Sequence, residues 1–173
     1  MVRRVVCMQR PKVTSYLEML SPSDLRGSTR TSFPVTLSEL DRQSPEVRRI
    51  TLRVGRPYNW PSQSWTDDEW HHYLTRPYLR HWLGTAGDDA IGIASMDVCP
   101  DGTVEIDTFG VAPDHVGRGL GSVFLAVATR TAWNAASDVK RVWLHTSSHD
   151  HPHALDNYLA RGFCIYKTVT ESW

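Results

Sequence analysis

The sequence has no excess of charge of either sign and no long apolar run. Lys plus Arg and Asp plus Glu number 19 each among 173 residues, so the formal net charge is zero. Proteins that bind nucleic acid or an anionic membrane surface carry a basic excess. No segment reaches the roughly eighteen apolar residues of a membrane span, and the N-terminus has too short an apolar stretch for a signal peptide. We therefore expect a cytoplasmic protein that binds neither nucleic acid nor membrane.

Cysteine is also scarce. Cys7, Cys99 and Cys164 are odd in number and lack metal-type spacing, so we expect reduced thiols. A histidine-rich segment near the C-terminus contains His145, His149, Asp150, His151 and His153. Zinc sites usually combine histidine with cysteine or use a HExxH helix. Neither pattern occurs, and the sequence predicts no metal site.

The length and the order of the elements indicate one α+β domain. A chain of 173 residues is expected to form a single domain over 1–173, with residues 1–11 as a loose N-terminal extension. Strands are expected at 13–20, 80–83, 90–98, 103–111, 139–145 and 163–169, and helices at 45–55, 66–75, 120–136 and 152–162. Residues 26–36 are expected to form a loop or a short helix. After residue 80 the order β-β-β-α-β-α-β favours a mixed sheet over a doubly wound one.

Three alternate glycines, Gly117, Gly119 and Gly121, separate the strand at 103–111 from the helix that begins at Leu120. Glycine lets the backbone turn sharply and approach a ligand. The start of the helix behind it offers unpaired N–H groups and the positive end of the helix dipole. Phosphate is the usual occupant of such a site. A dinucleotide fingerprint would need glycine in place of Ser122, and a P-loop would need Gly-Lys-Ser/Thr, so neither of these motifs fits.

Two segments resemble motifs of the GNAT (GCN5-related N-acetyltransferase) superfamily. Phe109–Ser122 is similar to the family's acyl-CoA loop, Gln/Arg-x-x-Gly-x-Gly/Ala, with Val116 at the Gln/Arg position. HPHALDNYLARGF (151–163) is similar to Asn-x-x-Ala-x-x-x-Tyr-x-x-x-Gly-Phe, with His151 at the Asn position. With the strands before them, the motifs cover roughly residues 82–173. The resemblance implies a mixed, mostly antiparallel central sheet with flanking helices, splayed where the acyl donor enters.

The resemblance further implies an N-acyltransferase that moves an acetyl or other acyl group from a CoA thioester directly to a small-molecule amine. The residues expected to bind acetyl-CoA or another acyl-CoA are Phe109, Gly110, Val111, Val116, Gly117, Arg118, Gly119, Leu120, Gly121, Ser122 and Asn157. Because Val116 removes one polar contact to a pyrophosphate, an acyl carrier protein is an alternative donor. A non-catalytic acyl-CoA-binding module is a third reading. The sequence does not give the oligomeric state, and a homodimer remains open.

Acyl transfer to an amine needs a base and a partner for the departing thiolate. A lysine-like amine has a pKa of about 10.4, so its deprotonation at pH 7 costs roughly 4.6 kcal/mol. Glu105 and Asp107 lie two residues apart and should share one face of their strand, opposite Val104 and Ile106. Of the two carboxylates Glu105 is favoured as the base, with Asp107, or His145 acting through water, as alternatives.

Tyr158 lies four residues before Gly162, where the family places a tyrosine that donates to the thioester sulfur. A hydroxyl at that position could protonate the leaving thiolate. The alternative reading is that Tyr158 packs in the core beside Ala154 on the same helix face. The sequence alone leaves both roles open.

The segment 55–65 is rich in aromatic residues and broken by proline, so it should be a loop. Tyr58, Trp60 and Trp65 are candidates for the wall of an acceptor site. They could equally cover the core, because aromatic side chains bury large areas. As a substrate wall they would favour an apolar or ring-bearing acceptor over a highly charged one.

Overall fold

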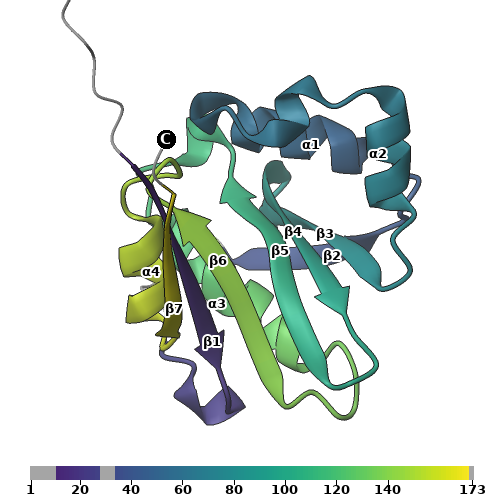
Figure 1. The fold of residues 1–173 in the computed structure, drawn as a ribbon. Helices are drawn as coiled ribbons and strands as arrows, with labels where there is room; N and C mark the ends of the chain where they lie inside the picture. Colours follow the sequence, from purple (N-terminus) through teal and green to yellow (C-terminus); the bar gives the residue numbers. More distant parts are fainter. Residues whose placement is uncertain (1–10, 28–33, 172–173) are drawn as a thin grey trace, which may run out of the picture.

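The chain forms a sheet with helices on both of its faces. The computed structural model describes residues 11–27 and 34–171 (Figure 1). The helices and strands follow one another as β1 (Lys12–Met19), β2 (Val35–Leu40), α1 (Pro45–Gly55), α2 (Asp67–Leu74), β3 (Leu79–Ala86), β4 (Asp89–Val98), β5 (Thr103–Val111), α3 (Leu120–Trp133), β6 (Arg141–Ser147), α4 (Ala154–Ala160) and β7 (Cys164–Glu171). No helix within the described ranges is long and apolar enough to cross a membrane.

The described strands form one seven-stranded sheet in the order β2-β3-β4-β5-β6-β1-β7. Neighbouring strands are antiparallel except β5 and β6, which are parallel. This is the mixed, mostly antiparallel sheet that the sequence predicted, and the α+β fold class is confirmed.

The parallel pair β5–β6 is short. It covers only Thr103, Val104 and Glu105, which face residues 141–143. Beyond Glu105 the two strands diverge, while β6 continues its pairing with β1 as far as Ser147. The divergence is the splay that the family resemblance implied, and it leaves one edge of β5 without a neighbouring strand (Figure 1).

Close contacts place α1 and α3 on opposite faces of the sheet. A Cβ added at Gly84 would lie 2.5 Å from the Phe124 side chain of α3, and one at Gly110 would lie 2.3 Å from Val54 of α1. Phe124 and Val54 are both buried. Glycine on these strands therefore lets each helix lie close against the sheet.

Strand β2 was not predicted. Val35 and Thr36 fell in a segment expected to be a loop or a short helix, and both lie in β2. The rest of that expected segment that the structure describes, residues 26–27 and 34, is irregular, and residues 28–33 lie outside the description. β2 is an edge strand that pairs only with β3. Its sequence, VTLSEL, has weak apolar alternation because only one edge and one face are covered, and a strand prediction depends on that alternation.

Several element boundaries differ from those predicted. The last helix begins at Ala154 rather than at Pro152, because the His151 side chain accepts a hydrogen bond from the His153 amide (3.1 Å) and holds Pro152 in a preceding turn. α3 ends at Trp133 rather than at Ala136. β6 extends two residues beyond His145. Of the expected N-terminal extension, residues 1–10 lie outside the described part of the chain.

The contact between Gly84 and Phe124 can be tested with Gly84→Ala. We expect a loss of about 1–3 kcal/mol in the free energy of unfolding, because the new methyl group meets the Phe124 ring at 2.5 Å. Urea denaturation measures the loss. Gly27→Ala is the matched control: a Cβ there has no atom within 4 Å, and its effect should stay within about 0.5 kcal/mol. Equal stabilities of the two variants would contradict this account of the packing.

Candidate active site

A cavity of about 1160 Å³ opens where β5 and β6 diverge. Its walls come from the glycine loop, the ends of β5 and β6, α4, and the segment between α1 and α2. The cavity is lined by these residues singled out in the sequence: Tyr58, Trp60, Trp65, Asp107, Phe109, Gly110, Val111, Val116, Gly117, Gly119, Gly121, Ser122, His145, Asn157 and Tyr158. Glu105, Arg118 and Leu120 do not line it. The fold thus gathers most of the predicted site from five separate segments.

The glycine loop leaves open space at the start of α3. Gly117 (φ 83°) and Gly119 (φ 74°) adopt the left-handed conformation that glycine reaches without strain. A Cβ at either position would meet no atom within 4 Å. Gly119 is the N-cap of α3, and no side chain caps this helix start. The first-turn amides of α3 are therefore oriented to receive an anion.

Two predicted loop residues have other surroundings. The Leu120 side chain is buried in the main core cluster, so it can contribute only its backbone to a ligand. Arg118 is exposed to solvent beside the loop. Val116 is exposed at the rim of the cavity and offers no polar side-chain group there.

The open edge of β5 carries amides that point toward β6. The Ala112 amide donates to the Ile91 carbonyl of the β4 side (2.7 Å). Alternate residues of an antiparallel strand direct their N–H groups to opposite sides. Gly110 therefore faces β4, whereas the amides of Phe109 and Val111 face the gap beyond the last β5–β6 pair.

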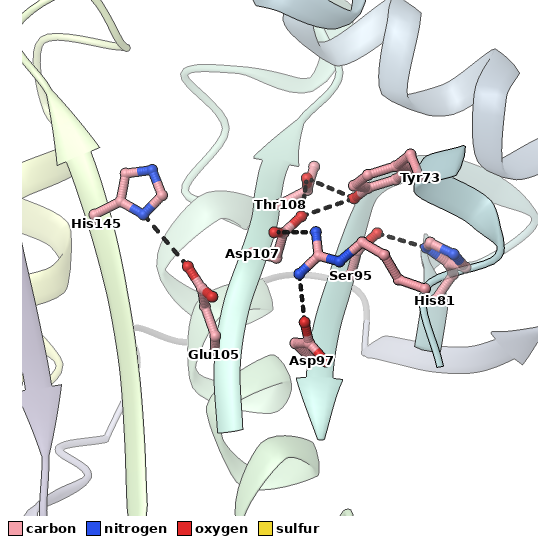
Figure 2. Close-up of polar contacts among 9 residues, drawn as sticks. Tyr73, His81, Ser95, Asp97, Glu105, Asp107, Thr108 and His145 are labelled. Atoms are coloured by element: carbon pink, nitrogen blue, oxygen red, sulfur yellow. Dashed lines mark hydrogen bonds and ion pairs between the residues drawn. The ribbon is translucent and has the colours of Figure 1, made fainter. Parts of the chain in front are cut away.

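Strand β5 contains a bulge before Thr108. The register changes from Ser95 opposite Thr108 to Met96 opposite Ile106, which leaves Asp107 as the extra residue. The prediction that Glu105 and Asp107 share a face, opposite buried Ile106, holds. However, the two carboxylates turn to different partners (Figure 2).

Glu105 pairs with His145 across the splay. The distance from His145 Nδ1 to Glu105 Oε1 is 3.5 Å. The hydrogen bond to Glu105 raises the pKa of His145 above its ordinary value, against the lowering effect of burial. The imidazole also packs on the Tyr16 ring at a centroid distance of 5.6 Å. Because the side chain is still 45% exposed, its other nitrogen can reach the cavity.

Asp107 belongs to a second network that sequence reasoning missed. Its Oδ1 accepts from Arg76 Nη1 (2.8 Å) and its Oδ2 from the Tyr73 hydroxyl (2.8 Å). Arg76 also pairs with Asp97. Burial, followed by the charge of Asp107, raises the pKa of Tyr73. The sequence predicted a helix at 66–75 but gave no signal for the polar partners of the residues in and after it.

His81 and Ser95 lie close to the same network on β3 and β4 (Figure 2). His81 is fully buried, and its Nδ1 lies 2.8 Å from the Ser95 hydroxyl. Burial lowers the pKa of His81 to about 4. At neutral pH this histidine is therefore uncharged and serves the packing of the sheet.

Tyr158 packs in the core and also borders the cavity. Its ring is buried between Phe109 and Phe163, with centroid distances of 6.4 and 6.3 Å. The residue also lines the cavity. Burial raises the pKa of its hydroxyl, and the charge of Asp150 adds to the effect. The hydroxyl forms no hydrogen bond with any described residue, so it is available as a donor.

Asn157 lies next to Tyr158 on α4 and joins this helix to the glycine loop. Its side-chain amide donates to the Gly121 carbonyl (3.3 Å). The contact holds the Tyr158 helix against the start of α3. Asn157 is thus partly committed to the protein itself, although it was expected to contact the pantetheine arm.

The aromatic segment between α1 and α2 both covers the core and lines the cavity. Trp65 packs against Trp70 and Tyr73 at centroid distances of 5.0 and 5.1 Å. The Trp60 indole donates to Asp150 (3.3 Å). Core packing and a place at the cavity wall are therefore compatible for these rings.

Across the described ranges, no three His, Cys, Asp or Glu side chains are arranged to hold a metal ion.

The sequence matches the model of the Acetyltransferase (GNAT) family over residues 45–163. The match covers more than half of the chain, and the chain belongs to this family. Membership supports acyl transfer as the general class of activity. Sequence comparison with curated proteins gives no significant match.

Solved structures share the fold at low sequence identity. A GCN5-related N-acetyltransferase from Sphaerobacter thermophilus superposes with a TM-score of 0.68 and 16% identity, covering 93% of this chain and 51% of its own. One from Kribbella flavida gives 0.62 and 20%, covering 94% and 57%. An acetyltransferase from Thermus thermophilus gives 0.59 and 20%, covering 82% and 96%. The chain thus spans little more than half the length of the first two relatives. At these identities the likeness concerns the fold alone.

The Arg76 network can be tested with Arg76→Met. The variant leaves Asp97 and Asp107, both mostly buried, without their shared cation. Breaking a fully buried pair costs about 3–5 kcal/mol, and because Arg76 is 31% exposed we expect about 1–3 kcal/mol in urea denaturation. Arg49→Met removes an exposed pair with Glu46 and should cost no more than about 0.5 kcal/mol. A loss that small for Arg76→Met would mean that the network does not stabilise the α2 end of the site.

Proposed function

We propose that this protein transfers an acyl group, acetyl in the first instance, from a CoA thioester to the amine of a small molecule in a ternary complex. The observation that carries the proposal is the shared cavity. It brings an uncapped helix start behind a glycine loop, the open amide edge of β5 and the Tyr158 hydroxyl to one space.

The residues present fit an acyl-CoA. The surroundings of Gly117 and Gly119 are open and would leave room for a pyrophosphate, whose oxygens the amides at the start of α3 would bind. The amides of Phe109 and Val111 would bind the pantetheine arm and the thioester carbonyl. When bound, the thioester supplies an activated acyl group. The residues of the chain hold it, orient it and handle the protons.

For the base we favour His145, with Glu105 as the residue that orients it. Asp107 is occupied by Arg76 and Tyr73, and Glu105 does not line the cavity. His145 in its neutral form would take the proton from the acceptor ammonium, directly or through water. The carboxylate at 3.5 Å stabilises the imidazolium that results. This pairing raises the basicity of the imidazole toward that of the amine.

Tyr158 would stabilise the departing thiolate. Since its pKa lies above that of free tyrosine, and a thiol has a pKa of about 8.5, complete proton transfer to the sulfur is unfavourable. The hydroxyl therefore acts chiefly as a hydrogen-bond donor to the developing negative charge. Its position between Phe109 and Phe163 fixes the direction of that bond.

An acyl carrier protein is a second candidate donor. It is favoured by Val116, whose exposed apolar side chain stands where the family places a polar residue for the pyrophosphate. A carrier presents the same pantetheine arm on a single phosphate. Comparison of acetyl-CoA with an acetylated carrier protein as donors separates the two. The donor with the higher kcat/KM is the natural class.

The glycine loop is tested with Gly119→Asp. A carboxylate there would repel the pyrophosphate and fill the open space, and we expect acetyl-CoA affinity to fall at least about tenfold by calorimetry. Gly87→Asp is the matched control, because Gly87 also has positive φ (60°) and open surroundings but lies in the β3–β4 turn. Acetyl-CoA binding unchanged in Gly119→Asp would remove the assigned role of the loop.

The pairing of His145 with Glu105 is tested by the pH profile of kcat/KM. Activity should rise with pH as His145 loses its proton, with a midpoint above the ordinary histidine pKa because Glu105 stabilises the charged form. Glu105→Gln removes that stabilisation, so the midpoint should move to lower pH. Glu39→Gln, an exposed glutamate that pairs with Arg80, is the control. A midpoint that Glu105→Gln leaves in place, or raises, would exclude His145 as the base.

A further inference from the structure

Asp150 is a carboxylate at the cavity that has no ion-pair partner among residues 11–27 and 34–171, although its charge acts on His145. It lies in the connection between β6 and α4 and lines the cavity. Its Oδ1 accepts from the Trp60 indole (3.3 Å), and its Oδ2 accepts from the Thr146 hydroxyl (2.9 Å) and the Ser147 amide (2.7 Å). All three donors are neutral. Within the part of the chain that the structure describes, Asp150 forms no ion pair.

The other acidic groups around the cavity differ from Asp150. Asp107 is paired with Arg76, Glu105 with His145 and Glu171 with Lys12. Asp156 also lacks an ion pair among the described residues, but its side chain is exposed on α4, where water solvates the charge. Asp150 is partly buried. A carboxylate withdrawn from water is stabilised by a cation, and the cavity side is where one can enter.

Aromatic side chains line the same cavity as this carboxylate. Trp60 donates to it directly. Tyr58 and Tyr158 line the cavity as well, and burial, followed by the charge of Asp150, raises the pKa of both hydroxyls. A carboxylate beside aromatic faces is the usual composition of a site for an organic ammonium group.

We propose that Asp150 determines acceptor specificity by binding a second positive charge on the acceptor, so that the natural substrates are diamines or related polycationic amines. The inference rests on the proposed acyl transfer. One amine of the acceptor would lie at His145 for acylation, while the other ammonium group would lie against Asp150, Trp60 and Tyr58. The aromatic wall was expected from the sequence to favour an apolar or ring-bearing acceptor. Next to an unpaired carboxylate, the same rings favour a cation.

The kinetic test uses acetyl-CoA with matched pairs of linear monoamines and terminal diamines of three to six carbons. At the chain length that spans the site, we expect kcat/KM for the diamine to exceed that of its monoamine about tenfold. Asp150→Asn should bring this ratio close to one through a higher KM for the diamine. Asp156→Asn removes an equal charge from the exposed rim and should retain the preference.

The proposal is overturned if the wild-type protein shows no preference for the diamine at any length, or if Asp150→Asn keeps the preference. Because Asp150 also accepts bonds from Thr146 and Ser147, its variant could fail to fold. Tyr58→Leu then decides, since it removes an aromatic wall without touching those bonds. A preference reduced severalfold supports the site, and an unchanged preference rejects it.

A binding experiment separates this inference from the proposed function. Nitrogen-15 spectra of the wild-type protein report the Trp60 indole N–H, which Trp60→Phe assigns. Addition of 1,4-diaminobutane should shift this resonance, whereas 1-aminobutane should not. If no amine is acylated but the shift occurs, the transferase proposal fails and the cation site stands. The cation site is rejected if the diamine produces no shift, or no more than the monoamine does.

Discussion

The architecture of this protein depends on the point where β5 and β6 stop pairing. A buried amide without a partner costs about 1–3 kcal/mol, so a fold does not leave a strand edge open without compensation. Here the open edge begins after Glu105, and it faces a cavity large enough to hold a ligand. The structural cost of separating two strands is offset when a ligand with carbonyl groups takes their place. The same interruption thus accounts for the shape of the sheet and for the position of the site.

The two separated strands are held from different sides. β6 retains β1 as a neighbour from Val142 to Ser147, and β5 retains β4. On β5 the bulge turns Asp107 toward α2, where Arg76 and Tyr73 bind it. On β6 the pairing of His145 with Glu105 bridges the start of the gap. Each strand is therefore held by a neighbouring strand on its far side and by side-chain contacts beside the gap. These contacts oppose closure of the gap between β5 and β6.

The sequence predicted those parts of the site that are encoded locally. The glycine loop, the start of α3 and the position of Tyr158 each depend on residues within a few turns of one another, and motif spacing reports such arrangements directly. The edge strand β2 was missed because its pattern is weak on its own and its pairing with β3 joins residues far apart in the sequence. The Arg76–Asp107 network was missed for the same reason. Periodicity describes which face of α2 is apolar, but it does not indicate what a charged residue after the helix will meet.

Charge pairing decides which of the acidic residues remain available for chemistry. Glu105 was the favoured base in the sequence and Asp107 the alternative, although two carboxylates two residues apart in a strand are hard to tell apart from sequence alone. In the fold, Asp107 is bound by the Arg76 guanidinium, which it shares with Asp97, so its carboxylate is already paired within the protein. Glu105 pairs with a histidine, whose charge can change near neutral pH, and for this reason we assign the proposed proton transfer to that pair. Asp150 forms no ion pair among the described residues, and it lines the cavity, where a cation can reach it.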